Sequence, residues 1–232
     1  MKSTNSGLSM KNAALITGFS LLLMAVFAPI ANFGIVESLV VPGDPALTVD
    51  NINNAENDFR MAIFLFFIVA LLDVIVAWSI FYLLLPVDRS LSLLGAWLRL
   101  VYAAILVIAL GNYLNILDLL WGETSNLLTG NLLNAQVIMS LDAFHNAWGL
   151  GLIVFGFHLL VVGYLAYKAD HIPSWLGILI LIAGLGYAVD GLGGVLSSSY
   201  NLQLAMFTFI GEVLLIFWCL WVGFKGFPKQ ED

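Results

Sequence analysis

The sequence predicts an all-α, polytopic membrane protein built as a bundle of six transmembrane helices. Hydrophobic residues make up 61% of the chain and charged residues only 10%, whereas a soluble domain usually has about 25% charged residues. Apolar runs alternate with gaps rich in Gly and Pro, and several runs exceed the roughly 18 residues that indicate a membrane span. A surface with so few charges must face hydrocarbon, which favours one compact membrane domain.

The first apolar run follows Lys2 and Lys11 and resembles a secretory signal. Its stretch "ALITGFSLLLMAVFAPIA" is longer than the roughly 7–15 residues of a signal core, and no clear cleavage site follows. We therefore predict a retained helix. Residues 34–58 come next and are predicted as an external loop, in which Thr48 or Asp50 would cap a short surface helix.

The later spans are separated by short polar gaps such as "LPVDRS", "GETSN" and "ADHIPS". The third and fourth runs exceed the roughly 20 residues that a span needs, so they should tilt or project from the bilayer. The predicted membrane domain, 13–224, has spans at 13–33, 59–85, 91–121, 134–168, 175–196 and 203–224, between an N-terminal tail, 1–12, and a C-terminal tail, 225–232.

The positive charges predict the orientation of the bundle. In a six-span arrangement the basic residues of the loops and tails fall on one side, and the opposite loops contain no Lys or Arg, so both termini should be cytoplasmic and the protein should lie in the inner (cytoplasmic) membrane. The net charge of -7 comes from segregated acids and indicates no particular partner, while the lack of a basic patch with interleaved aromatics argues against nucleic acid. The residues behind the orientation are Lys2, Lys11, Arg89, Lys168, Lys225 and Lys229.

Two opposite charges fall inside neighbouring spans. Asp73 lies roughly 18 Å, and Arg99 roughly 12 Å, from the cytoplasmic ends of the second and third spans. A charge at mid-bilayer costs about 2.5–3.5 kcal/mol unless it is paired or hydrated. Because a short turn joins these spans, we predict an Asp73–Arg99 ion pair, which would serve either as a structural clasp or as part of a gate or proton relay.

The fourth span carries polar residues on two different faces. At about 100° per residue, Asp142, His145 and Asn146 share a face with a stripe of glycines and are predicted to point into the bundle. His158 falls on the other side, at greater depth. The predicted outer polar cluster, lining an externally open cavity, comprises Asn112, Asn115, Asp118, Asp142, His145, Asn146 and Asp190.

These residues favour some chemistries over others. One imidazole among carboxylates is few for zinc, and histidines on opposite helix faces do not suit a bis-histidine haem, so we predict no metal and no cofactor. General acid–base chemistry by His145 with Asp142 lacks a distinctive nucleophile. A proton or cation pathway needs only ionisable groups at successive depths, which this chain has.

Several stretches resemble an uncharacterised bacterial membrane family called domain of unknown function 4386. They are "FHLLVVGYLAYKADHIPSWLGILILIAGLGY", "IGEVLLIFWCLWVGFKG", "FYLLLPVDRSLSLLGAWLRLV" and "DPALTVDNI", and the resemblance runs from about residue 11 to 227. It implies a shared topology but no activity. The positions that the resemblance implies are shared are Arg60, Asp73, Arg99, His158, Pro173, Gly177 and Glu212.

From these observations we expect a buried polar relay or gate made of Asp73, Arg99, His158 and Glu212. Transport or permeation of a small solute, linked to protons or cations, is the favoured function. An intramembrane enzyme, metal-assisted or not, and a non-catalytic accessory or sensor subunit are the alternatives. Membrane lipids and a small molecule or ion are the expected partners, and both a monomer and a homo-oligomer remain open.

Overall fold

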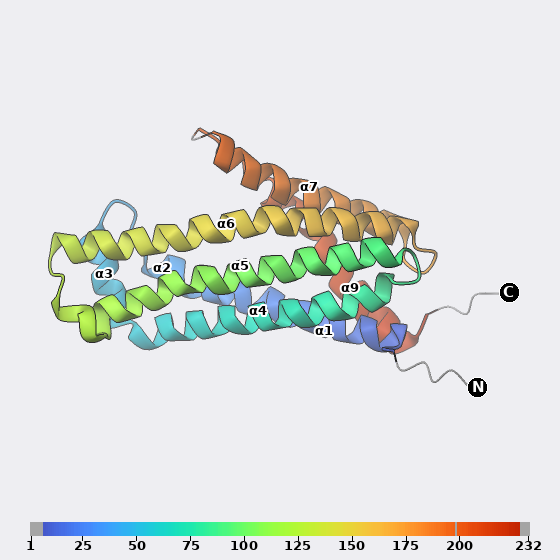
Figure 1. Ribbon diagram of the computed structural model, residues 1–232, viewed down its shortest axis with the longest axis horizontal. Helices are drawn as coiled ribbons and strands as arrows, with labels where there is room; N and C mark the ends of the chain where they lie inside the picture. The colour runs from blue at the N-terminus through green and yellow to red at the C-terminus, as the bar shows by residue number, and fades with distance from the viewer. Residues whose placement is uncertain (1–6, 198, 228–232) are drawn as a thin grey trace. The chain divides into compact units, whose positions relative to one another are not determined.

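The computed structural model describes residues 7–197 and 199–227, which form helices joined by turns, with no strand among them (Figure 1). Lys2 and Lys229, which enter the orientation argument, lie outside these residues. The helical elements are α1 (Met10–Pro29), the π-helix η1 (Ile30–Val36), α2 (Glu37–Leu39), α3 (Pro45–Asn54), α4 (Glu56–Leu84), α5 (Arg89–Trp121), the 3₁₀ turn η2 (Glu123–Asn126), α6 (Asn131–Lys168), α7 (Ser174–Leu196), α8 (Ala205–Thr208) and α9 (Ile210–Lys225).

Within the described part of the chain, six helical stretches are long and apolar enough to cross a membrane. This confirms the predicted all-α, multi-pass class. The side of the membrane that each terminus faces stays a prediction. The stretches are Met10–Leu39, Glu56–Leu84, Arg89–Trp121, Asn131–Lys168, Ser174–Leu196 and Ala205–Lys225.

The first span continues beyond its predicted end. Pro29 lies inside the helix, and the π-helix η1 begins at the next residue and carries the span on to Leu39. Proline has no N–H to donate along the helix, and wider π turns commonly accommodate such local disruption. Residues 34–58, predicted as a loop, are therefore largely helical.

The start of α3 differs from the prediction as well. Asp44 caps it by accepting a hydrogen bond from the Leu47 backbone N–H at 3.0 Å, with Pro45 in the first turn. Thr48 lies one turn inside, buried, where its hydroxyl donates to the Asp44 carbonyl at 2.9 Å. The cap predicted at Thr48 or Asp50 is wrong because the Asp-Pro pair starts the helix earlier.

The chain divides into two compact units that share the long helices. The first unit contains Met1–Leu22, Leu72–Tyr102 and Leu152–Asp232, and the second contains Leu23–Leu71 and Ala103–Gly151. Each unit has its own packing, described below.

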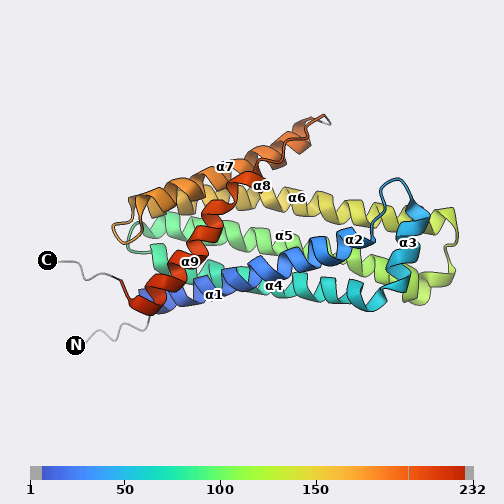
Figure 2. The ribbon, with the colours of Figure 1, turned by 180° about the vertical axis from the view of Figure 1, so that it is seen from behind.

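The second unit is organised around buried aromatic rings from α4, α5 and α6. Tyr113 stacks on Phe144 with ring centroids 3.9 Å apart, while Phe66 lies 5.4 Å from Phe144 and 5.6 Å from Trp148. Figure 2 shows α3 running across the ends of the helices in this unit, where Val49 and Ile52 of α3 are buried. Aromatic rings in such tilted and stacked contacts hold three helices together.

The ring stack gives a first stability prediction. Phe144→Ala should lower the free energy of unfolding by about 3–5 kcal/mol, since the ring is fully buried and its loss leaves a cavity. Tyr113→Phe should have no effect or stabilise the protein, because the enclosed Tyr113 hydroxyl has no hydrogen-bond partner among the described residues. Thermal unfolding in mild detergent measures both; equal losses for the two variants would contradict this account.

In the first unit, α6 and α7 pack closely through glycines. A Cβ added at Gly156 would lie 2.7 Å from the Ala188 nitrogen, and one at Gly184 would lie 2.8 Å from the Gly156 oxygen. Figures 1 and 2 show α7 lying against the C-terminal part of α6 and separating from it toward the C-terminal end of α7. Small residues at such positions let helix backbones approach, as the glycine stripe of the fourth span predicted for this part of α6.

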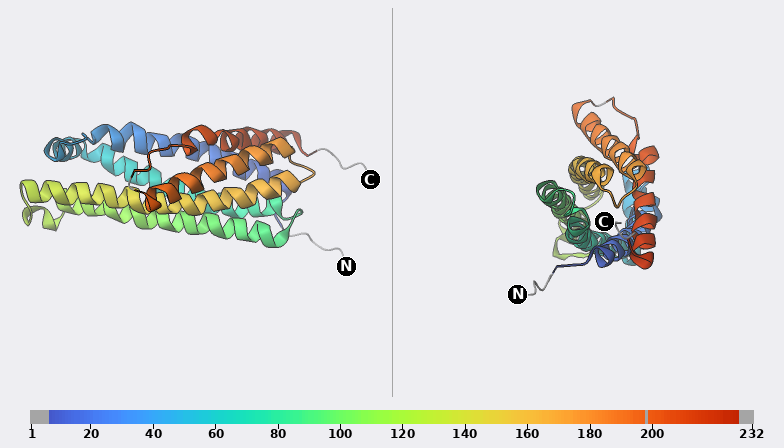
Figure 3. Two further views of the ribbon diagram at one scale, coloured as in Figure 1. Left: turned by 90° about the horizontal axis from the view of Figure 1, so that it is seen from above. Right: turned by 90° about the vertical axis from the view of Figure 1, so that its right-hand side faces the viewer.

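Helix α9 completes this unit by packing on α7 and α1. A Cβ at Gly211 would lie 2.6 Å from the Leu179 carbonyl group, and one at Gly18 would lie 2.9 Å from the Leu220 side chain. The right-hand view of Figure 3 shows α1 and α9 side by side. Glu212, one residue after Gly211, is thereby held against α7.

Candidate functional site

The first unit encloses an ion pair between α4 and α5. Arg99 Nη2 lies 2.7 Å from Asp73 Oδ1, and the side chains are 3% and 0% exposed. Both Asp73 oxygens are shielded from solvent. The predicted Asp73–Arg99 contact is confirmed. Two charges with so little exposure interact strongly, since neither water nor salt screens them.

His158 of α6 binds the same arginine. Its Nδ1 lies 2.8 Å from the Gly95 carbonyl oxygen, and its Nε2 lies 3.2 Å from Arg99 Nη1. A carbonyl can only accept, so Nδ1 carries the proton and donates it; Nε2 then accepts from the guanidinium. The contacts assign a neutral imidazole, completely buried, with both nitrogens engaged. The sequence had placed His158 toward a different neighbour from His145, and that neighbour is α5.

Aromatic rings surround this group. The Arg99 guanidinium carbon lies 5.3 Å from the Phe155 ring centroid, within cation–π range, and Phe155 stacks on His158 at 5.7 Å. Tyr102 and Tyr187 approach the same ring at 4.9 and 5.3 Å. Phe155 therefore packs against both the arginine and the histidine and adds no opposite charge.

A second carboxyl group lies in the electrostatic field of the arginine. Glu212 of α9 interacts electrostatically with both Arg99 and Asp73 and is hydrogen-bonded to Tyr187 of α7. Its Oε1 atom is enclosed and has no hydrogen-bond partner among the described residues. The predicted relay residues Asp73, Arg99, His158 and Glu212 thus belong to one neighbourhood, called here the Arg99 cluster.

The outer polar cluster does not form as predicted. Asp142, His145 and Asn146 are exposed on α6, so the expectation that they point into the bundle is wrong. The glycine contacts with α7 begin at Gly156, whereas a Cβ at Gly149 would meet nothing within 4 Å. The stripe of glycines therefore marks a packing face only in the later part of α6, and it does not extend to the turn that carries Asp142.

The remaining members of that cluster in the second unit serve helix contacts or face outward. Asn115, itself exposed, donates to the Ser140 hydroxyl at 2.9 Å and so links α5 to α6. Asn112 donates to the Ala109 carbonyl at 3.1 Å within α5. Asp118 is exposed near the end of α5. Polar side chains here do not enclose a common cavity in the way expected.

Asp190, in the first unit, has a local structural role. It accepts hydrogen bonds from the Tyr200 hydroxyl at 2.6 Å and from the Ala205 backbone N–H at 2.7 Å. The hydrogen bond to Asp190 raises the pKa of Tyr200 to about 12, so this phenol stays protonated at a pH where an ordinary tyrosine ionises. Asp190 therefore ties the loop after α7 to the start of α8.

Among residues 7–197 and 199–227, no three His, Cys, Asp or Glu side chains come together in a way that could hold a metal ion. In the Arg99 cluster, the His158 nitrogens are both engaged by Gly95 and Arg99. A guanidinium beside the imidazole also disfavours a bound cation at that nitrogen.

Sequence reasoning identified the charged members of the Arg99 cluster but missed their neutral neighbours. Tyr102 follows Arg99 by three residues, and Phe155 precedes His158 by three, a spacing that puts each pair on one helix face. That spacing could have predicted that Tyr102 and Phe155 belong to the cluster. No local signal marks the Gly95 carbonyl or Tyr187, because their roles depend on which helices pack together.

Comparison with known proteins gives a family but no activity. A family model described as "Domain of unknown function (DUF4386)" matches residues 16–223, which is nearly the whole membrane domain. The sequence resemblance is confirmed by this match.

A relative from Archaeoglobus fulgidus, described as an uncharacterized protein, is 38% identical over 159 residues. The alignment covers 68% of this chain and 82% of the relative. The resemblance described a bacterial family, and this relative is archaeal. No solved structure matches the chain.

Proposed function

This chain belongs to the family described as domain of unknown function 4386, and we propose that its Arg99 cluster is the working part of a proton-linked transport or permeation protein. The observation that carries the proposal is one buried arginine that interacts with two carboxyl groups. Asp73 pairs with Arg99 at 2.7 Å, and Glu212 lies within its electrostatic field. We also propose the inner membrane, with both termini cytoplasmic, as the location.

The charge balance of the cluster favours a single exchangeable proton. Arg99 contributes one positive charge and His158 none, since its contacts assign a neutral ring. If Asp73 and Glu212 were both ionised, the enclosed group would carry a net negative charge, which is costly in a membrane interior. One proton held by either carboxyl group makes the cluster neutral, so the two acids titrate as a coupled pair.

That balance provides a simple switch. When Glu212 holds the proton, Arg99 pairs with Asp73, as in the structure. When the proton moves to Asp73, the ionised Glu212 becomes the better partner for the long arginine side chain. The hydrogen bond between Tyr187 and Glu212 would rearrange in the same step, because Glu212 changes from a carboxylic acid to a carboxylate. Alternation of Arg99 between two partners gives the cluster two states, and exchange between them moves one proton between the carboxyl groups.

Proton flux into proteoliposomes tests this function. With a potassium gradient and valinomycin setting the membrane potential, vesicles containing the protein should acidify several-fold faster than empty vesicles. Glu212→Gln should reduce the rate to that of empty vesicles, since the amide keeps hydrogen bonding to Tyr187 possible but cannot ionise.

Asp142→Asn is the matched control, because it removes an exposed carboxylate from α6 and should leave the flux unchanged. Size-exclusion profiles of the wild type and both variants should match, which checks that all three proteins are folded. Equal flux through wild type and Glu212→Gln, or wild-type flux no faster than empty vesicles, would refute the proposal and favour the accessory-subunit alternative, in which the charges only hold helices together.

A further inference from the structure

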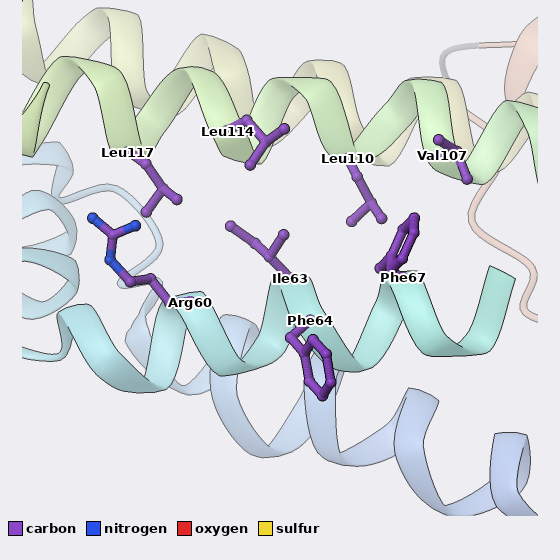
Figure 4. Close-up of a pocket in the computed structure, with 8 residues that line it drawn as sticks. All are labelled: Arg60, Ile63, Phe64, Phe67, Val107, Leu110, Leu114 and Leu117. Atoms are coloured by element: carbon purple, nitrogen blue, oxygen red, sulfur yellow. The ribbon is translucent and has the colours of Figure 1, made fainter. Parts of the chain in front are cut away.

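The second unit contains a groove on its surface, lined by residues that the proposed function does not use. The groove has a volume of about 440 Å³ and lies between α4 and α5, as Figure 4 shows. Its lining is apolar apart from one arginine at one end. The lining residues are Arg60, Ile63, Phe64, Phe67, Val107, Leu110, Leu114 and Leu117.

The length of α4 puts Arg60 at the depth of lipid headgroups. The helix has 29 residues and is about 44 Å long, whereas the hydrocarbon core is about 30 Å thick. Arg60 is the fifth residue of α4, so it lies near the hydrocarbon boundary whichever way the helix is oriented. Phe67 is about 10 Å deeper. The groove therefore begins at the interface and runs into the hydrocarbon layer, as a lipid does.

Arg60, at the polar end of the groove, is paired with Glu56 one turn earlier on the same helix. Arg60 Nε and Nη2 contact Glu56 Oε1, both at 2.8 Å, and the two side chains are 47% and 38% exposed. An ion pair this exposed contributes little stability and can exchange partners easily. Arg60 is the only Lys or Arg in the sequence of the second unit. An anionic headgroup would find one cation there in otherwise acidic surroundings.

We propose that this groove binds one phospholipid molecule with a zwitterionic phosphate–ammonium headgroup, such as phosphatidylethanolamine. The phosphate would bind the Arg60 guanidinium, and the ammonium would donate to the Glu56 carboxylate. One acyl chain would lie along the apolar wall toward Val107. The proposal concerns a different unit from the Arg99 cluster and does not rest on the proposed function.

Lipid retention tests the headgroup. Purified protein is incubated with phosphatidylethanolamine, phosphatidylcholine and phosphatidylglycerol carrying identical acyl chains, and bound lipid is counted by native mass spectrometry. Phosphatidylethanolamine should be retained best, because the choline group has no N–H donor and the glycerol headgroup leaves a net negative charge beside Glu56. Arg60→Gln should weaken retention about fivefold, the size expected for one basic side chain at a lipid surface.

Adjacent residues of α5 provide matched steric variants. Val107 lines the groove, whereas Ile108 is 73% exposed and is not among the lining residues. Val107→Trp should reduce retention of every lipid, and Ile108→Trp should behave as wild type. Arg89→Gln, a change at an exposed arginine outside the groove, is the charge control and should also behave as wild type.

Equal retention by Val107→Trp and Ile108→Trp would overturn the groove as a binding site. Equal retention of the three lipids, or equal effects of Arg60→Gln and Arg89→Gln, would overturn the headgroup assignment.

Discussion

Replacing Arg99 with methionine should lower the free energy of unfolding by about 3–5 kcal/mol, the cost of leaving one member of a buried ion pair without its partner. The variant would strand Asp73, which is completely buried, and would also remove the donor to His158 Nε2. Denaturant or thermal unfolding in mild detergent, followed by circular dichroism, measures the loss.

Two further variants make this result interpretable. Arg60→Met removes the partner of Glu56 in an exposed pair and should cost no more than about 1 kcal/mol. The double variant Asp73→Asn/Arg99→Gln replaces both charges with neutral polar groups and should recover much of the stability lost in Arg99→Met. If Arg99→Met were no more harmful than Arg60→Met, the buried pair would not be the clasp described here.

The double variant also distinguishes a structural clasp from a relay. Stable protein that has lost proton flux would mean that the charges are needed for more than folding. Stable protein with unchanged flux would assign the Asp73–Arg99 pair to packing alone and would leave Glu212 as the sole candidate for the proton site.

The second large effect is expected at the contact between α6 and α7. Gly184→Val should prevent accumulation of folded, monodisperse protein, because its Cβ would lie 2.8 Å from both the Gly156 oxygen and the Leu160 nitrogen. Those are backbone atoms and can move only if the helices separate. Overpacking a well-packed interior lowers the free energy of unfolding by about 1–3 kcal/mol. A clash with backbone atoms should cost the upper value of that range or more.

Gly149→Val is the matched control. Gly149 precedes Gly156, the α6 glycine that faces Gly184, by seven residues, but a Cβ at Gly149 would meet nothing within 4 Å. This variant should fold with a thermal midpoint near that of wild type. Fluorescence-detected size exclusion and thermal scanning compare the two. A Gly149→Val protein as damaged as Gly184→Val would mean that glycine in the helix, and not the α6–α7 contact, is what matters.

Much of this architecture could be predicted from the sequence because it depends on local properties. Hydropathy and length determine which stretches can cross a bilayer, so the six spans and the all-α class followed directly. The Asp73–Arg99 pair was also predictable, since a short turn joins their helices and the depths of the two charges can be counted from it.

What the sequence could not determine is which helix lies beside which face. Helical phase gives the direction of a side chain about its own axis, but not the neighbour in that direction. Asp142, His145 and Asn146 shared a phase with the glycines and yet are exposed, because the α7 contacts that the glycines make begin only at Gly156.

The same reason explains the Arg99 cluster. Its charged members are visible in the sequence as exceptions within apolar runs, because burying a charge in a membrane is costly wherever it occurs. The Gly95 carbonyl that orients His158, and the tyrosine that holds Glu212, come from helices that meet only after folding. The sequence by itself determined which residues needed partners. The tertiary structure decided which partners they have, because a contact depends on the distance between two helices and not on the position of a residue along its own helix.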